Sequence, residues 1–208
     1  MKVTTIILAG GKNLRLGRNK ALEIFNGHSL IEHIIERLSP LSSQTLVVTS
    51  QEQTDFPAAS KAEVLVDLYP GKGPLGGIYT GLQASRTSHS LVVACDMPFL
   101  NTDLLKYMIG LSGGFDAVVP KLEEGMVEPL HAVYSHSCIE EIKKRLESNH
   151  LGVHTFLNTV RVRYIEREEI QRLDPEFRSF FNINYQKDLE RAIDMTGEIV
   201  SDSRWLSI

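Results

Sequence analysis

Residues 3–20 read VTTIILAGGKNLRLGRNK and join an apolar run to a glycine pair and a cationic loop. The run from Val3 to Leu8 is rich in branched side chains, which is typical of a buried strand. Gly10 and Gly11 directly after it indicate a turn, because glycine adopts positive φ at little steric cost. We therefore predict a buried first strand that opens into a loop at its carboxyl end.

Strand-like and helix-like segments alternate from this first strand to about residue 120. Glu32 follows Ser29 at the spacing of a capping box, and Asn101 can cap a later helix. Further strands are predicted at 45–49, 64–66, 91–95, 117–119 and 130–134, and helices at 29–39, 77–86, 102–111, 138–147 and 187–195. This alternation predicts an α/β fold, a three-layer Rossmann-like domain with a mostly parallel sheet. Ligands bind at the carboxyl ends of the strands in such folds, so the loops after strands are the informative ones.

The composition limits the classes of protein to consider. The chain has 208 residues and a mass of 23.3 kDa, with no repeat or low-complexity linker, so we expect a single domain over residues 1–208. Its net charge of −4 argues against a large nucleic-acid footprint. Its uncharged apolar runs are far shorter than the roughly 20 residues of a membrane span, and its first residues lack a signal-peptide pattern. These features predict a cytoplasmic protein with no nucleic-acid or membrane partner.

The loop after the glycine pair contains four cations and no acidic residue: Lys12, Arg15, Arg18 and Lys20. Arg15 offers a planar fork to phosphate oxygens, and Lys20 supplies a compact charge on a flexible stem. A glycine turn and cations in one strand-following loop suit a bound triphosphate. The alternative is a solvated basic loop that only turns the chain, but the register of Arg15, Gly17 and Lys20 favours phosphate binding. The glycine spacing does not fit a Walker-type phosphate loop.

Asp96 follows the predicted strand 91–95 and therefore opens onto the same edge of the sheet. A carboxylate beside a triphosphate would be repelled unless a divalent cation lay between them. Mg²⁺ binds one or two carboxylates together with phosphate oxygens and keeps several waters. A helix cap or a loop hydrogen bond is the alternative role of a lone strand-end aspartate. Because Asp96 occurs together with the cationic loop, we favour a magnesium ligand.

The segment 71–76 is a rival candidate, because Gly-x-Gly-x-x-Gly is the dinucleotide-binding fingerprint and Asp96 follows at a strand end. Four residues separate the predicted strand from this turn, however, and Pro74 stiffens it. A dinucleotide site there would also leave the cations of the first loop unexplained. The fingerprint is therefore the weaker hypothesis.

The histidines give weaker signals still. His150 and His154 have the i, i+4 spacing of a metal-binding pair, but Gly152 between them weakens a shared helix. His131 falls in a strand-like apolar run, where we expect a hydrogen-bonded and partly buried imidazole that could line a binding site.

The first loop resembles the signature of nucleotidyltransferases that join a nucleoside monophosphate to a phosphorylated acceptor. The matching residues are Leu8 to Gly11, Arg15, Gly17 and Lys20. Five blocks in order resemble the molybdenum cofactor guanylyltransferase family within that class: Leu-Ala-Gly-Gly at 8–11, Gly-Pro-Leu-Gly-Gly at 73–77, Cys-Asp-Met-Pro at 95–98, Glu-Pro-Leu-His-Ala-Val-Tyr at 128–134 and Phe-Asn-Ile-Asn at 181–184. The resemblance extends from residue 3 to about residue 192. Related cytidylyltransferases usually carry Leu-Ala-Ala-Gly and lack Gly-Pro-Leu, so the blocks favour guanine.

The chain also departs from the family pattern. Asn13, Leu16 and Asn19 replace the usual Ser, Met and Asp, and Tyr185-Gln186 stands where Thr-Pro is common. Asn13 keeps a hydrogen-bonding group and Leu16 keeps the volume, so the phosphate loop retains its character. The last departure concerns the loop on the acceptor side.

The resemblance implies transfer of GMP from GTP to the terminal phosphate of the molybdopterin-bound molybdenum cofactor, with release of pyrophosphate. It implies catalytic roles for Arg15, Lys20 and Asp96, with Mg²⁺ on Asp96. It implies the following GTP-binding residues: Leu8, Ala9, Gly10, Gly11, Lys20, Asp67 and Asp96. On the acceptor side it implies His131, Asn182 and Asn184. Gly10 and Gly76-Gly77 would keep the approach to the base open. Transient contacts with proteins that deliver or receive the cofactor are also implied.

Two alternatives remain open from the sequence. One is a molybdenum cofactor cytidylyltransferase or another small-molecule nucleotidyltransferase. The other is a non-catalytic nucleotide or cofactor carrier, which would have no need for both Lys20 and Asp96.

Overall fold

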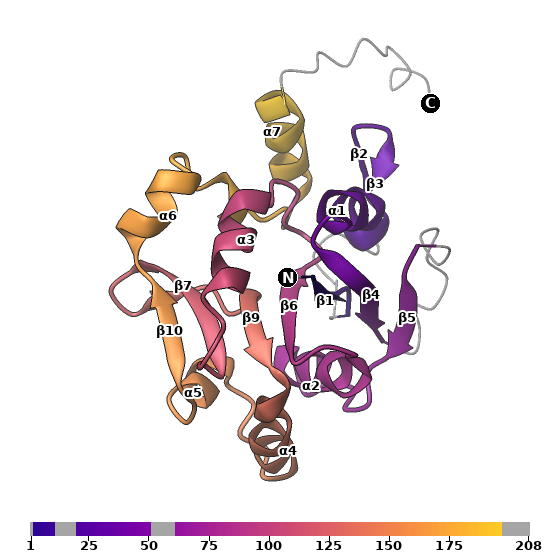
Figure 1. The fold of residues 1–208 in the computed structure, drawn as a ribbon. Helices are drawn as coiled ribbons and strands as arrows, with labels where there is room; N and C mark the ends of the chain where they lie inside the picture. Colours follow the sequence, from indigo (N-terminus) through magenta and orange to yellow (C-terminus); the bar gives the residue numbers. More distant parts are fainter. Residues whose placement is uncertain (1, 11–19, 51–60, 197–208) are drawn as a thin grey trace.

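The computed structural model describes residues 2–10, 20–50 and 61–196. The protein has a central sheet with helices on both faces (Figure 1). The predicted first strand is β1 (Val3–Leu8), and all six of its residues are buried. It lies between β4 (Ser42–Thr49) and β6 (His89–Ala94). A strand buried on both faces reads as a continuous apolar run, which explains the composition of this stretch.

The strand order across the main sheet is β10-β7-β9-β6-β1-β4-β5, and β8 pairs with β7. The other strands are β5 (Glu63–Val66), β7 (Ala117–Glu123), β8 (Met126–Val127), β9 (His131–Ser135) and β10 (Val162–Ile165). Pairing is parallel between β1 and each neighbour, between β4 and β5, and between β7 and β10. β9 runs antiparallel to both β6 and β7. The predicted mostly parallel α/β sheet is confirmed. A separate two-stranded hairpin, β2 (Ile24–Phe25) with β3 (His28–Ser29), was not anticipated.

The helices divide between the two faces of the sheet. α1 (Leu30–Leu38), α3 (Thr102–Gly110) and α6 (Arg167–Leu173) share one core cluster. α2 (Pro74–Ala84), α4 (Ile139–Glu147) and α5 (Val153–Leu157) share the other. α7 (Gln186–Thr196) packs in a third cluster beside the hairpin. No helix in the described ranges is long and apolar enough to cross a membrane.

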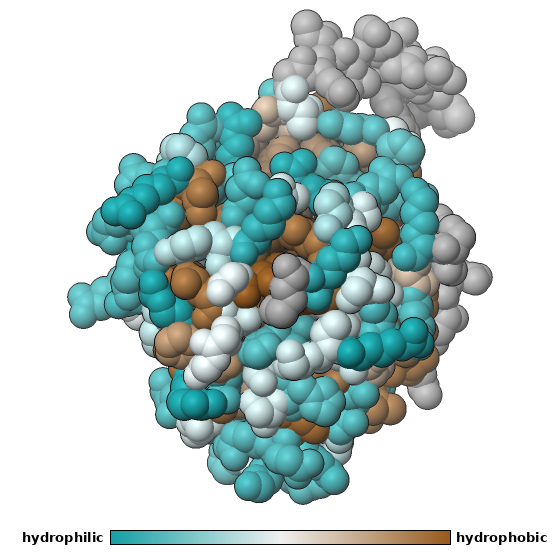
Figure 2. Space-filling view, in the orientation of Figure 1, coloured by the Kyte–Doolittle hydropathy of each residue, from teal (hydrophilic) through white to brown (hydrophobic). Residues whose placement is uncertain are grey.

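Side chains of β1 alternate between the two main clusters, so this one strand holds the three layers together. Ile7 packs with the α1 and α3 side, whereas Ile6 packs with the α2 and α4 side. Figure 1 shows α1 and α3 on one side of the sheet and α2 and α4 on the other. The face seen in Figure 2 is mostly hydrophilic, as expected where helices turn their apolar stripes inward.

The predicted start of the first helix is confirmed, and that of the second is wrong. Ser29 and Glu32 form the predicted capping box, with Ser29 N donating to Glu32 Oε2 at 3.0 Å. α2 begins at Pro74 rather than at Gly77. Proline is favoured in the first turn of a helix, where its missing N–H would have no intrahelical partner. Gly73 precedes it at φ +69°, which glycine tolerates. The dinucleotide-fingerprint hypothesis requires a loop at Pro74, but α2 begins at this residue.

Gly81 brings α2 against β1. A Cβ atom at this position would lie 2.4 Å from Ile6 Cγ2, closer than real atoms approach. Gly81→Ala should therefore lower the free energy of unfolding by about 1–3 kcal/mol through overpacking. Gly110→Ala, at the end of α3 with open space around it, should be neutral or stabilising by roughly 0.5–1 kcal/mol. Urea unfolding of both variants measures this, and a Gly81→Ala protein as stable as wild type would contradict the close contact.

Candidate functional site

Strand-following loops gather at one edge of the sheet, where β1, β4 and β6 end side by side. Cys95 N donates to Leu8 O at 3.2 Å, so the loop bearing Asp96 leaves the sheet beside the end of β1. Ala9 N continues the pairing with Val48 O at 2.8 Å. Asp67 enters the same edge through a 2.8 Å bond from its backbone N to Thr49 O. The three predicted segments thus meet, as parallel pairing requires.

Lys20, Asp96 and Asn184 form the polar cluster at this edge. Lys20 Nζ lies 2.8 Å from Asn184 Oδ1 and 3.5 Å from Asp96 Oδ2. The side chains of Lys20 and Asp96 are only 12% and 20% exposed. A paired lysine and carboxylate this sheltered from water interact more strongly than a surface ion pair. The structure brings together three of the predicted site residues, from three distant parts of the chain.

The loop before α7 is tied to the strand edge by backbone bonds. Ile183 N donates to Asp96 O at 2.9 Å, and the Ile183 side chain is fully buried. Asp188 Oδ2 accepts from the backbone N of Asn184 at 2.9 Å and of Tyr185 at 2.8 Å. Asp188 was not among the predicted residues. An acidic residue in the first turn of a predicted helix was the available signal, because its carboxylate can accept from free N–H groups there.

Burial raises the pKa of the Asp96 carboxyl, and the Lys20 charge and hydrogen bond oppose that rise. The ionised carboxylate is therefore costly to bury but is stabilised by one adjacent cation. Burial likewise raises the pKa of the neighbouring Cys95 thiol to about 12, so it stays protonated near neutral pH. Cys95 is thus a buried structural residue rather than a nucleophile.

Asp67 is half-buried, and its carboxylate organises the loop that leads into α2. Oδ1 accepts from Tyr69 N at 3.0 Å and from Thr80 Oγ1 at 2.9 Å. These intramolecular contacts alone can explain why an aspartate stands at this strand end, and no bound ligand is needed to explain it. The predicted contact between Asp67 and a nucleoside stays a prediction.

Gly76 and Gly77 allow close packing, and the prediction that they keep the approach to the base open stays a prediction. A Cβ at Gly77 would lie 3.0 Å from Leu8 Cδ2, and one at Gly76 would lie 3.0 Å from Tyr69 O. A side chain at either position would therefore press against neighbouring protein atoms. Gly10 differs, because a Cβ there would make ordinary contact, 3.4 Å from Ser50 N.

The expectation for His131 is wrong. Its side chain is fully buried on β9, and neither ring nitrogen has a hydrogen-bond partner in the described part of the chain. The ring packs 4.9 Å from that of Phe180, centroid to centroid. The side chain has no exposed surface with which to contact an acceptor, because antiparallel pairing with Val93 turns it into the core beneath α3. Burial lowers its pKa to about 3.

The remaining predicted residues have different outcomes. Asn182 Nδ2 donates to Phe180 O at 3.3 Å, and no bond joins its side chain to Lys20 or Asp96. Leu8 and Ala9 are buried at the end of β1. Gly11 and Arg15 lie outside the described residues.

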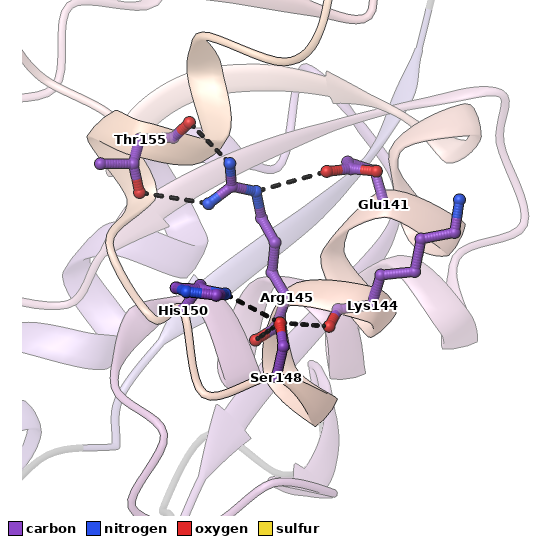
Figure 3. A pocket seen from close by; sticks show the side chains of 6 residues that line it. All are labelled: Glu141, Lys144, Arg145, Ser148, His150 and Thr155. Carbon is purple, nitrogen blue, oxygen red and sulfur yellow. Dashed lines mark hydrogen bonds and ion pairs between the residues drawn. The ribbon is translucent and has the colours of Figure 1, made fainter.

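A hollow of about 420 Å³ lies between α4 and α5 (Figure 3). The guanidinium of Arg145 occupies the polar groups that line this hollow. It donates to Thr155 Oγ1 and Thr155 O and pairs with Glu141. His150 lies at its rim before α5 begins, whereas His154 lies within that helix, so the two share no helix face. Among the described residues, no three metal-ligating side chains form a group. The hollow contains none of the predicted site residues.

Solved structures share this fold. Molybdopterin-guanine dinucleotide biosynthesis protein A from Archaeoglobus fulgidus superposes with a TM-score of 0.80 at 31% identity, covering 93% of this chain and 98% of that one. The 2-C-methyl-D-erythritol 4-phosphate cytidylyltransferase of Thermus thermophilus gives a TM-score of 0.70 at 17% identity, covering 95% and 100%. The second likeness shows the fold alone. Together with the strand-edge site and the sequence relatives described next, the first likeness defines a nucleotidyltransferase.

Sequence relatives narrow the class. The family model of the MobA-like NTP transferase domain matches residues 5–164. The molybdenum cofactor guanylyltransferase of Desulfosudis oleivorans is 35% identical over 192 residues, which cover 91% of this chain and 94% of that protein. A probable molybdenum cofactor guanylyltransferase of Methanosarcina mazei is 37% identical, covering 95% and 92%. The chain belongs to the MobA-like, molybdenum cofactor guanylyltransferase family.

The buried His131 predicts a pH-dependent stability. The unfolded state takes up a proton near pH 6.5, whereas the folded state resists protonation down to about pH 3. Stability should therefore fall as the pH drops below about 6.5, by about 2 kcal/mol between pH 7 and pH 5 from this residue alone. His131→Leu should remove that loss of stability. The variant should also be at least as stable as wild type at pH 7, because it no longer buries an imidazole without a hydrogen-bond partner.

Urea unfolding at pH 7 and pH 5 measures the difference. His136→Gln, at an exposed histidine, is the control and should keep the wild-type pH dependence. A His131→Leu protein that lost as much stability as wild type on acidification would contradict the assignment.

Proposed function

We propose that this protein transfers GMP from GTP to the terminal phosphate of the molybdopterin-bound molybdenum cofactor, giving the guanine dinucleotide cofactor and pyrophosphate. The observation that carries the proposal is the sheltered Lys20–Asp96–Asn184 cluster at the carboxyl ends of β1 and β6. Relatives that align over nine-tenths of the chain and bear the guanylyltransferase name support the same reaction.

The chemistry requires charge control more than proton transfer. The terminal phosphate of the acceptor has a second ionisation near pH 6, so it is largely a dianion at neutral pH. It can attack the α-phosphorus of GTP without a general base, and the bond to the leaving pyrophosphate breaks as the new one forms. The protein therefore has to hold two anions together and stabilise the departing charge.

Lys20 is suited to that task because its ammonium is already held at the strand edge. It would exchange its contacts with Asn184 and Asp96 for phosphate oxygens and place one positive charge beside the reacting groups. Arg15, in the same loop of the sequence, would add a planar fork to the phosphates. The backbone of Leu8 to Gly11 would hold the guanine base, and Asp67 would orient the nucleoside. Asn184 would stay on the acceptor side, positioned by Asp188.

Nucleotidyltransferases generally use a divalent metal ion, and we propose Mg²⁺ here. The donor set fits this ion, because Mg²⁺ needs only one or two protein carboxylates when phosphates and waters complete its octahedron. Asp96 is such a carboxylate, still 20% exposed at the open strand edge. When bound, the ion would neutralise charge on the phosphate oxygens.

A test of the reaction is pyrophosphate release from each nucleoside triphosphate, with and without molybdopterin cofactor. GTP should be preferred over CTP and ATP, since a site built to hydrogen-bond one base leaves groups unpaired with another. A preference for CTP would favour the cytidylyltransferase alternative. Binding of GTP and acceptor with no pyrophosphate release would favour a non-catalytic carrier.

Asp96→Asn should reduce turnover by about 10² to 10³, because an amide is a poor magnesium ligand. Its stability should not fall. The raised pKa of Asp96 means that the ionised form opposes folding at neutral pH, and a neutral side chain removes that cost. Steady-state rates and thermal unfolding measure the two effects, with exposed Asp103→Asn as the control. Wild-type turnover with unchanged magnesium dependence would contradict the role of Asp96.

A further inference from the structure

The segment of residues 174–184 connects α6 to α7 and carries Asn182 and Asn184 to the site. We call it the acceptor strap. It contains the 3₁₀ turn Arg178–Phe180, and in Figure 1 it passes α3 on its way between the two helices. A segment with so little regular structure needs specific side-chain bonds if its end is to stay in a fixed place.

The acceptor strap runs alongside the loop that follows Asp96. At one end of that loop, Asn101 N donates to Ser179 Oγ at 2.9 Å. At the other end, Asp96 O accepts from Ile183 N at 2.9 Å. The two segments therefore lie side by side in opposite directions and are bonded at both ends. The position of the strap's asparagines relative to Asp96 thus depends on how the strap is folded where it meets this loop.

Asp174 folds the first part of the acceptor strap. Its side chain is buried, and both carboxylate oxygens accept from the backbone of the 3₁₀ turn. Oδ1 accepts from Arg178 N at 3.1 Å, and Oδ2 accepts from Ser179 N at 2.8 Å. N–H groups at the start of a helical turn have no partner within it, so the carboxylate satisfies two of them. Bonds from backbone N–H groups to a carboxylate are stronger than bonds between neutral groups.

The same bonds hold a strained residue in place. Phe177 lies at φ +54°, a left-handed conformation that is unfavourable for a bulky side chain. Its backbone N donates to Asp174 O at 3.0 Å. Its ring lies 4.4 Å from the Arg167 guanidinium and 6.4 Å from the ring of Phe180. Without the Asp174 carboxylate we expect the turn to relax at Phe177 and to shift the strap beyond it.

We propose that Asp174 is a positioning residue for the phosphorylated acceptor. By folding the acceptor strap it sets Asn182 and Asn184 at the distance from Asp96 that the acceptor requires. This inference rests on the proposed function for the identity of the acceptor. Asp174 would act through the backbone and would not touch the substrate, since its side chain is buried in the strap.

Steady-state kinetics with the molybdopterin cofactor and GTP varied in turn separate this role from a merely structural one. Asp174→Ala should raise the KM for the molybdopterin acceptor about tenfold, because a small misplacement of binding groups is costly. The KM for GTP should change by less than about twofold, since the residues proposed to bind GTP follow β1, β5 and β6. Asp174→Asn keeps one accepting oxygen, so its KM for the acceptor should lie between those of wild type and Asp174→Ala.

Two control variants and a second measurement accompany these kinetics. Gly81→Ala is destabilised at a site outside the strap, and Glu176→Gln changes an exposed carboxylate within it. Both should keep the wild-type KM for the acceptor. Amide hydrogen exchange at Ile183, whose N–H is bonded to the Asp96 loop, should be faster in Asp174→Ala but not in Glu176→Gln. This measurement requires neither substrate.

Several outcomes would overturn the inference. An Asp174→Ala protein that is less stable in urea but keeps the wild-type KM for the acceptor, as Gly81→Ala should, would make Asp174 a structural residue only. Equal rises in both KM values would indicate general distortion of the site. If Asp174→Ala does not fold, Asp174→Asn decides the question. A wild-type protein that releases no pyrophosphate from GTP would defeat the proposed function, and equilibrium binding of the molybdopterin cofactor together with exchange at Ile183 would still decide the role of Asp174.

Discussion

Parallel pairing of β1 with both β4 and β6 is the constraint on which the site depends. Leu8 lies opposite Val48 on one side and Ala94 on the other, so the three strands end at the same level. Each polar side chain of the site belongs to a segment that follows one of these strand ends, or to a segment hydrogen-bonded to such a segment. The register holds because β1 is buried on both faces, and a slip by one residue would exchange its two sets of side chains. The Gly81 contact with Ile6 shows how closely α2 is packed against this strand.

The site also joins the beginning of the chain to its end. Lys20 contacts Asn184 across 164 residues of sequence, and the backbone bond from Ile183 to Asp96 fixes the same segment. In this cluster the charge of Lys20 offsets part of the free-energy cost of burying the ionised Asp96 carboxylate. Such an arrangement sacrifices some stability for a preorganised charge, which is the usual condition of sites that handle phosphate.

The reversed strand β9 has a consequence that the block at 128–134 does not reveal. Antiparallel pairing with β6 turns His131 inward, where it packs against Phe180 without a polar partner among the described residues. One strand direction thus removes a predicted acceptor residue from the site.

The sequence by itself determined the α/β class, the buried first strand, the capping box at Ser29 and the presence of Lys20 and Asp96 in segments that follow strands. These are local properties: apolar runs, cap spacing and glycine turns act within a few residues of one another. It also indicated Asn184, but only through resemblance. The tertiary structure alone decided that Asn184 rather than Asn182 meets Lys20, that His131 is buried, and that Gly76 and Gly77 serve packing. Each of these depends on strand order, strand direction or the contact of distant segments, and periodicity along one chain does not specify which segments will become neighbours.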